Sequence, residues 1–211
     1  MRGLYPILDL ETVHRTGLEP LAVAERVLEA RPSLLQLRAK RASAKLTLAL
    51  LEALLPLCRR QGTLLFANDR PDLAVLAGAD GVHLGQEDLP IAAVRRMAPG
   101  LRIGVSTHDM QQLEEALAEA PDYVAFGPVF ATTSKRNPDP VVGTEGLARA
   151  AARAERSGIP LVAIGGIDLE RAPAIAERGA LGAVISALLV DSLPGIAARA
   201  RALHDALGGA R

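Results

Sequence analysis

Short apolar runs with the composition of β-strands alternate with segments of helical periodicity along the whole chain. Eight runs have strand character, at residues 5–8, 34–37, 63–67, 81–84, 102–105, 123–126, 161–164 and 183–185. The segments between them carry apolar residues on one helical face, as Met110, Leu113 and Leu117 do. Eight strand–helix units in 211 residues favour an α/β protein with one domain over residues 1–211, folded as a closed TIM (β/α)8 barrel. A doubly wound open sheet is the alternative, but its glycine fingerprint is absent from the sequence.

Charge and aromatic content restrict the classes of partner. The formal net charge is zero, so we expect no strong non-specific binding to nucleic acid. Aromatic residues make up 2% of the chain, too few to stack along a single strand. No window is apolar enough for a membrane span and the first residues lack a signal-peptide pattern, which predicts a cytoplasmic protein without a membrane partner. The one cysteine, Cys58, lies in a leucine-rich segment and is expected to be buried and reduced.

Side chains suited to chemistry follow the ends of the predicted strands. They include Gln36, Arg38, Lys40, Asn68, Asp69, Gln86, Asp88, Ser106, His108, Gly165, Gly166 and Ser186. The loops that follow parallel strands all open on one face of a barrel, where enzymes of this fold place their active sites. We therefore expect these residues to surround one site. The loops at the opposite face read as plain turns.

The connection after the sixth predicted strand is long, which is typical of functional loops. It contains Gly127-Pro128, a turn signal, and then Thr132, Ser134 and Lys135. Two hydroxyls and a cation without an acid among them suit an anionic ligand. A solvated, proline-rich surface loop is the alternative, and the polar residues after the other strands favour the anion.

Gln36, Arg38 and Lys40 alternate along an extended segment, so they are expected to point to the same side. An amide, a guanidinium and an ammonium on one side suit a charged, hydrogen-bonding ligand such as a phosphate ester. The alternative is a pair of solvated cations at the end of a strand.

Asp69 and Asp88 are isolated carboxylates on neighbouring loops. Two carboxylates together with substrate phosphate oxygens form a typical Mg²⁺ site, because Mg²⁺ keeps several waters and needs few protein ligands. Each aspartate precedes a proline near a helix start, so an N-cap is the alternative for either one alone.

Gly165-Gly166 would let backbone amides approach a phosphate after the seventh strand, and Ser186 adds a hydroxyl after the eighth. A tight turn that needs positive φ is the alternative for the glycines. The histidines are weaker signals. We expect His83 to be packed within a strand, His108 to lie near the mouth of the barrel, and the remaining two, His14 and His204, to lie on the surface.

Taken together, several motifs resemble thiamine phosphate synthase over nearly the whole chain. They are Gln36-Leu37-Arg38-Ala39-Lys40, Asn68-Asp69-Arg70, the run from Ala79 to Asp88, Gly104-Val105-Ser106, Gly127-Pro128-Val129-Phe130 with Thr132 to Lys135, and Ala163-Ile164-Gly165-Gly166-Ile167. The run Ala-Asp-Gly-Val-His-Leu-Gly-Gln-Glu-Asp is the specific one. Ile-Gly-Gly-Ile occurs in many phosphate-binding barrels.

The resemblance implies a barrel enzyme that joins a pyrimidine methyl diphosphate to a thiazole phosphate and releases pyrophosphate. It implies that the diphosphate substrate is held by Gln36, Arg38, Lys40, Asn68, Ser106 and Lys135, of which Arg38, Lys40, Ser106 and Lys135 also assist catalysis. By the same resemblance, Mg²⁺ is held by Asp69 and Asp88, and the thiazole phosphate by Thr132, Ser134, Gly165, Ile185 and Ser186. A pyrimidine carbocation attacked by the thiazole nitrogen needs no strong general base.

Some positions depart from the family pattern, and related functions remain open. Leu8 precedes Asp9 where the family usually has threonine, and Ala131 stands where proline is common. The related thiazole tautomerases typically carry histidine at the position of Pro128, which favours the synthase. A regulatory relative without catalysis and a sugar-phosphate isomerase are two further functions compatible with such a barrel. The sequence leaves open the oligomeric state, a homodimer included, and the choice between carboxylated and decarboxylated thiazole phosphate.

Overall fold

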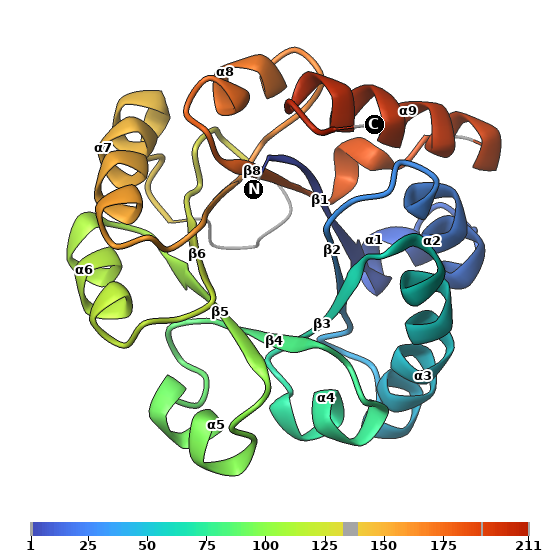
Figure 1. The fold of residues 1–211 in the computed structure, drawn as a ribbon. Helices are drawn as coiled ribbons and strands as arrows, with labels where there is room; N and C mark the ends of the chain where they lie inside the picture. Colours follow the sequence, from blue (N-terminus) through green and yellow to red (C-terminus); the bar gives the residue numbers. More distant parts are fainter. Residues whose placement is uncertain (1, 133–138, 191, 211) are drawn as a thin grey trace.

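The strands form a closed parallel barrel in sequence order, in which β8 pairs with β1. The computed structural model describes residues 2–132, 139–190 and 192–210. The strands are β1 (Gly3–Asp9), β2 (Leu34–Arg38), β3 (Leu64–Asn68), β4 (Gly81–Leu84), β5 (Arg102–Thr107), β6 (Tyr123–Phe126), β7 (Leu161–Ile164) and β8 (Leu181–Val184). Figure 1 shows them as an inner ring with the helices outside. The predicted TIM barrel is therefore confirmed.

Helices connect successive strands and cover the outside of the barrel (Figure 1). They are α1 (Leu10–His14), α2 (Pro20–Leu28), α3 (Ala44–Gln61), α4 (Pro71–Ala77), α5 (Ile91–Met97), α6 (Met110–Ala118), α7 (Gly143–Arg156), α8 (Ala172–Ala176), the 3-10 helix η1 (Ser186–Leu188) and α9 (Leu193–Ala206). Ser43 caps α3 by accepting a hydrogen bond from the Leu46 N–H, and Asp109 caps α6 in the same way from Gln112. These caps fix the far ends of two loops that carry predicted site residues.

All eight predicted strands are present, with small differences at their ends. The eighth begins at Leu181, earlier than expected, because Gly182 reads as a turn residue in the sequence. In the fold, a Cβ on Gly182 would lie 2.5 Å from Leu207 Cδ2. Glycine at this position lets the end of α9 pack directly on β8, so its role is close approach and not a turn.

The interior of the barrel is filled by side chains of its own strands. This inner core consists of Tyr5, Ile7, Leu34, Phe66, Tyr123, Ala125, Val162, Leu181 and Ala183. The rings of Phe66 and Tyr123 occupy the space opposite Gly81 and Gly104, where a Cβ would lie 2.3 Å from Phe66 Cε1 and 2.0 Å from Tyr123 Cζ. The barrel is thus a packed core that closes the site from below.

Two expectations about buried residues are confirmed, and one about a surface residue is wrong. Cys58 is buried in α3, and His83 is buried in β4. His14 is exposed, but His204 is only 6% exposed. Its Nδ1 accepts a hydrogen bond from the Leu4 N–H at 3.3 Å, because α9 packs against the start of β1. Among the described helices, none combines the length and the apolar composition needed to cross a membrane.

Candidate active site

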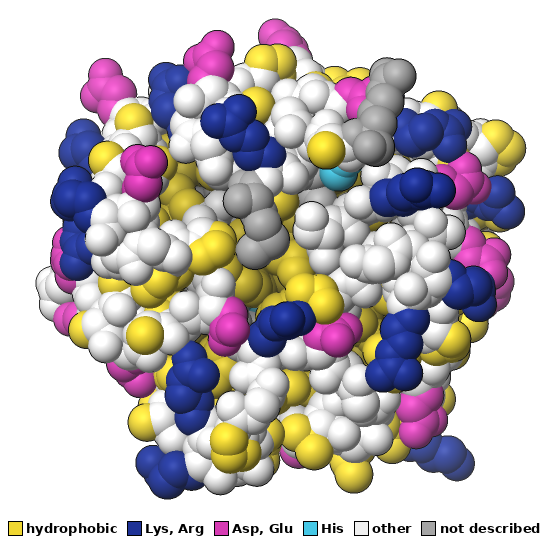
Figure 2. All heavy atoms as spheres, in the orientation of Figure 1, with side chains coloured by type: hydrophobic (Ala, Val, Ile, Leu, Met, Phe, Trp, Pro, Cys, Tyr) yellow, Lys and Arg dark blue, Asp and Glu magenta, His cyan; other side chains and the backbone are white. Residues whose placement is uncertain are grey.

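A cavity of about 640 Å³ opens at the carboxyl ends of the strands. It is lined by every described member of the predicted site: Gln36, Arg38, Lys40, Asn68, Asp69, Asp88, Ser106, Thr132, Gly165, Ile185 and Ser186. Ser134 and Lys135 lie outside the described residues. Figure 2 shows the opposite face of the barrel, at the amino ends of the strands, where acidic and basic side chains are mixed around apolar side chains. The structure therefore brings together residues that are far apart in the sequence, while their individual roles remain predictions.

Arg38 is held by Asp9, a residue to which the sequence motifs gave no role in the site. The register of β1 and β2 places the two residues side by side at their strand ends, and Arg38 Nη1 donates to Asp9 Oδ2. Asp9 Oδ1 caps α1 by accepting from the Thr12 N–H at 2.9 Å and from the Thr12 hydroxyl at 2.6 Å. Burial disfavours the carboxylate, but the hydrogen bonds from Thr12 and Arg38 outweigh it and lower the pKa of Asp9. Asp9 is therefore an anion that orients the guanidinium.

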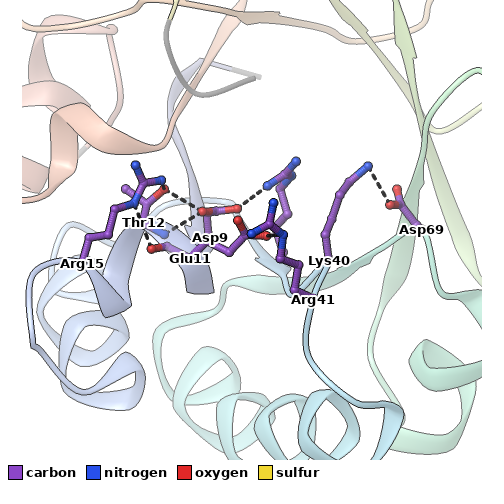
Figure 3. Close-up of polar contacts among 8 residues, drawn as sticks. Asp9, Glu11, Thr12, Arg15, Lys40, Arg41 and Asp69 are labelled. Carbon is purple, nitrogen blue, oxygen red and sulfur yellow. Dashed lines mark hydrogen bonds and ion pairs between the residues drawn. The ribbon is translucent and has the colours of Figure 1, made fainter. Parts of the chain in front are cut away.

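Lys40 contacts Asp69 across the gap between β2 and β3, with Nζ 3.1 Å from Oδ2. Figure 3 shows how acidic and basic side chains follow one another from the end of β1 to Asp69. Asp69 has φ +63°, a conformation that is uncommon for residues other than glycine. Its N–H donates to the His83 carbonyl, which fixes this conformation and aims the carboxylate at Lys40.

Neither predicted metal ligand is a helix cap, so the capping interpretation is wrong for both. The N-cap residue of α4 is Arg70 and that of α5 is Pro90, and neither makes a side-chain capping bond. Asp88 instead accepts a hydrogen bond from the Gly85 N–H at 2.6 Å, within the loop that follows β4. Both carboxylates are therefore available to the cavity.

The environment of Asp88 suits a cation. Burial raises the pKa of Asp88, the nearby Asp69 raises it further, and the Gly85 N–H opposes the change. Two carboxylates that repel each other in this way are stabilised by a cation between them. The described residues contain no group of three or more His, Cys, Asp or Glu side chains that could hold a metal ion. A two-carboxylate site fits Mg²⁺ when a diphosphate provides further oxygen ligands.

Polar atoms beneath the cavity form one continuous chain, which we call the interior hydrogen-bond chain: Gln36, Tyr5, Tyr123, His83 and Ser106. Gln36 Nε2 lies 2.9 Å from Tyr5 Oη, which lies 2.8 Å from Tyr123 Oη. Tyr123 Oη is 2.8 Å from His83 Nδ1, and His83 Nε2 is 2.8 Å from Ser106 Oγ. Gln36 and Ser106, at the two ends, both line the cavity. The sequence analysis assigned roles in the site to these two ends but to none of the three residues between them.

Burial determines the protonation states of the side chains in the interior hydrogen-bond chain. It lowers the pKa of His83 to about 4, so the ring is neutral at physiological pH. It raises the pKa of Tyr5 to about 12 and also raises that of Tyr123, so both hydroxyls keep their protons. Strand parity is the sequence signal for these residues, because alternate residues of barrel strands point inward.

Gly165 and Gly166 form a tight turn packed against the loop after β6. Their φ angles are +102° and +63°, the positive values expected of such a turn. A Cβ on Gly165 would lie 2.5 Å from Pro128 Cβ. The Phe130 N–H donates to the Gly165 carbonyl at 3.1 Å, which joins the two loops. Ser186 begins η1 on the other side of this turn and is exposed to the cavity.

His108 lies at the mouth of the cavity, as expected. Its Nδ1 is 2.7 Å from the Gly127 carbonyl oxygen and 3.6 Å from Asp139 Oδ2. It therefore ties the end of β5 to the start of the loop after β6. This arrangement points to a structural role at the rim.

Comparison with known proteins identifies the family to which the chain belongs. The family model for thiamine monophosphate synthase matches residues 4–188. A thiamine-phosphate synthase of Chlorobium luteolum is 44% identical over 196 residues, which cover 92% of this chain and 90% of the relative. One from Thermus thermophilus is 45% identical over 186 residues, 88% of this chain and 87% of the relative.

A solved structure gives the same result. Thiamine phosphate pyrophosphorylase of Pyrococcus furiosus superimposes with a TM-score of 0.83 at 32% identity, covering 98% of this chain and 95% of the other. The match extends along nearly the whole chain. The chain belongs to the thiamine monophosphate synthase family.

Proposed function

We propose that this enzyme, a transferase of thiamine biosynthesis, joins a pyrimidine methyl diphosphate to a thiazole phosphate and releases pyrophosphate. The observation that supports this reaction best is the convergence of Arg38, Lys40, Asp69 and Asp88 on one cavity. Two cations and two carboxylates around a space of this kind suit a magnesium diphosphate. An isomerase acting on a single phosphate would have no need of the two aspartates.

The diphosphate end of the substrate is assigned to the cavity wall formed by β2 to β5. Arg38 and Lys40 would donate to its oxygens, and Asn68 and Ser106 would add neutral hydrogen bonds. Each cation already faces a carboxylate, Asp9 or Asp69. These carboxylates hold the two cations in place before the substrate arrives, which lowers the cost of organising the site.

Asp69 and Asp88 would hold Mg²⁺ together with the diphosphate oxygens. When bound, the ion would neutralise charge on the leaving pyrophosphate. Lys40 would then share Asp69 with the ion, and Lys135 would approach the same oxygens from the loop after β6. All of these residues act on the leaving group and not on the nucleophile.

The bond changes need little proton transfer. The bond between the methylene carbon and the diphosphate oxygen breaks, and its electron pair leaves with pyrophosphate. The thiazole nitrogen then donates its lone pair to the methylene carbon. The cations and the metal site would stabilise the departing charge, so the lack of an obvious general base is consistent with the reaction.

The thiazole phosphate is assigned to the opposite side of the cavity. Thr132, Ser134 and Ser186 would donate hydroxyl hydrogen bonds to its phosphate, beside Gly165 and Ile185. The turn after β7 and the start of η1 lie where phosphates commonly bind in barrels of this fold. This places the two substrates on opposite walls.

Several finer assignments belong to the same proposal. Pro128 and the retained cation and carboxylate set favour the synthase over the related tautomerase, whose members typically have histidine at that position. The single buried thiol, Cys58, suits a cytoplasmic enzyme. Zero net charge favours small phosphorylated substrates over nucleic acid as partners. A homodimer is compatible with these features.

The test is an assay of the purified protein with both substrates. We expect pyrophosphate and thiamine phosphate to form in equal amounts, only with both substrates and only with Mg²⁺. Omission of each component in turn is the control. Absence of thiamine phosphate at saturating substrates and Mg²⁺ would reject the proposed reaction. Isomerisation of the thiazole phosphate alone would favour the tautomerase.

A further inference from the structure

One side chain, Arg171, contacts both the turn after β7 and the loop after β6. Its Nη1 donates a hydrogen bond to the Gly166 carbonyl at 2.7 Å. The guanidinium carbon lies 5.1 Å from the centre of the Phe130 ring, within the range of a cation–π contact. Arg171 therefore joins the two segments that form the wall assigned to the thiazole phosphate.

The position of Arg171 is set by Asp168 at the start of α8. The Arg171 N–H donates to Asp168 Oδ1 at 2.9 Å, and Arg171 Nη1 lies 3.7 Å from Asp168 Oδ2. Arg171 and Phe130 do not line the cavity, whereas Gly166 and Thr132 do. In this arrangement Arg171 would act on a bound phosphate through the residues that it holds, and not by touching the phosphate.

The hydrogen bond from Arg171 sets the orientation of the peptide between Gly166 and Ile167. This peptide is trans, so its N–H points away from its carbonyl and therefore away from Arg171. Both Gly166 and Ile167 line the cavity, and neither N–H has an acceptor among the described residues. Successive backbone N–H groups of this kind bind anions. Arg171 thus fixes the direction of a donor that a phosphate can use.

The loop after β6 is packed directly on the same turn. A Cβ on Gly166 would lie 2.4 Å from the Ala131 carbonyl oxygen and 2.9 Å from Phe130 Cβ, so the two backbones are in contact. The Phe130 ring is half-buried and packs against the hydrophobic core, which makes it a fixed platform for the guanidinium. Thr132 follows two residues later and lines the cavity. The contact between Arg171 and Phe130 therefore also restrains the segment that carries Thr132.

We propose that Arg171, with Phe130 as its platform, is a positioning residue for the thiazole phosphate. It holds the Gly166–Ile167 peptide and the segment of Thr132 in the orientation that binds the phosphate. This inference rests on the proposed function for the identity and the place of that ligand. Donors that are fixed before the ligand arrives need not be ordered on binding, so their loss of order should lower affinity. The pyrimidine diphosphate is assigned to the other wall, and its binding should not depend on Arg171.

Arg171→Ala and Phe130→Leu test the two halves of this contact. We expect Arg171→Ala to weaken binding of the thiazole phosphate about tenfold, and Phe130→Leu about threefold without any change of charge. Affinity for the pyrimidine diphosphate should stay within about twofold of the wild type in both variants. Calorimetry with each ligand alone measures these values without turnover. Because both changes break one contact, the double variant should lose less than the product of the two single losses.

Two further variants separate positioning from charge. Arg178→Ala is the matched control, because Arg178 lies at the other end of α8 and pairs with Glu177 at 2.9 Å. It removes the same charge without disturbing the turn, so both affinities should stay unchanged. Arg171→Lys keeps the charge but lacks the planar guanidinium that covers the Phe130 ring, so it should recover only part of the loss. Full recovery by lysine, or an equal loss for both ligands in Arg171→Ala, would show that Arg171 acts by charge alone and would overturn the proposal.

The N–H signal of Ile167 gives a readout that is independent of turnover. In assigned ¹⁵N NMR spectra, we expect this signal to shift when the thiazole phosphate is added to the wild type, and to shift less in Arg171→Ala at saturating ligand. An equal shift in the two proteins would overturn the proposed role of Arg171. If the wild type bound the thiazole phosphate but formed no thiamine phosphate, the proposed reaction would fail, while the affinities and the Ile167 signal would still decide the role of Arg171.

Discussion

Arg38 donates to Asp9 at the adjoining ends of β2 and β1, and the side chain of Asp9 is 5% exposed while that of Arg38 is 22% exposed. The guanidinium that is expected to bind a diphosphate is thus held by a nearly buried carboxylate. Lys40 and Asp69 repeat this arrangement one strand further along. The two carboxylates orient the two cations and offset their positive charge. We therefore expect the cavity to attract a diphosphate bound to a metal ion more strongly than a diphosphate without one.

Asp9→Asn should lower the stability of the protein at neutral pH and should make that stability less dependent on pH in the acidic range. The amide keeps the two hydrogen bonds from Thr12 but loses the charge that pairs with Arg38, which should cost about 1–2 kcal/mol of unfolding free energy at neutral pH. The pKa of Asp9 is lower in the folded state than in the unfolded state. The stability that the Asp9 carboxylate contributes is therefore fully present above its unfolded-state pKa, and it is lost as the pH falls through its folded-state pKa. Urea unfolding at several pH values measures this.

The control for this prediction is Asp109→Asn, which keeps a helix cap without an ion pair. We expect its stability to stay within about 0.5 kcal/mol of the wild type. A difference between Asp9→Asn and wild type that is the same at pH 7 and pH 3 would contradict the assigned charge interaction.

Asp69→Asn and Asp88→Asn should each abolish most turnover and raise the Mg²⁺ concentration needed for half-maximal rate. Asparagine tolerates the positive φ of Asp69, and at Asp88 it can still accept from the Gly85 N–H, so both variants should fold. Loss of either charge weakens a site made of only two carboxylates. Circular dichroism checks the fold, and rates across a Mg²⁺ titration check the role.

Glu87→Gln is a useful comparison, because Glu87 lines the same cavity beside Asp88 but is not assigned to the metal. Its Mg²⁺ dependence should remain unchanged. Normal rates of both aspartate variants at limiting Mg²⁺ would reject the metal assignment.

Gly165→Ala should destabilise the protein more than Gly179→Ala. Both residues have positive φ, +102° and +71°, so both substitutions strain the backbone. Only at Gly165 would the new Cβ meet another group, Pro128 at 2.5 Å, whereas nothing lies within 4 Å at Gly179. The rigid proline cannot move aside, so we expect an additional loss of about 1–3 kcal/mol. Equal urea-unfolding midpoints for the two variants would show that the turn after β7 and the loop after β6 can move apart easily.

Ser186→Ala should weaken binding of the thiazole phosphate and leave binding of the pyrimidine diphosphate nearly unchanged. One hydroxyl hydrogen bond to a charged phosphate contributes on the order of 1.5–3 kcal/mol at most. Calorimetry with each ligand separately measures both affinities. An equal loss for the two ligands would contradict the proposal that the substrates bind to opposite walls of the cavity.

Lys135→Ala should reduce turnover more than it raises the Michaelis constant. The ammonium would meet pyrophosphate oxygens as they gain charge, and an interaction that strengthens in the transition state acts mainly on kcat. We expect a loss of about two to three orders of magnitude, as for other donors to developing charge. Lys135→Arg should recover part of it. Steady-state kinetics that show a raised Michaelis constant at normal turnover would limit Lys135 to binding.

The barrel and the face that carries the site could both be predicted from the amino-acid sequence. Alternation of strand and helix patterns is a local property, because apolar periodicity is set by residues close in the chain. The carboxyl ends of parallel strands share one face by topology, so the convergence of Arg38, Asp69 and Ser106 followed from their positions at or just after the ends of strands. The chemistry was predicted from the resemblance of the sequence motifs to thiamine phosphate synthase.

The partners of these side chains, in contrast, depend on the folded barrel. The pairing of Asp9 with Arg38 requires the register of two strands separated by α1 and α2. The burial of His204 and the use of Gly182 as a strand residue both depend on where α9 packs. The contact between Tyr5 and Tyr123 joins residues 118 positions apart. Such contacts arise when the barrel closes, and local periodicity carries no information about partners that are brought together by closure.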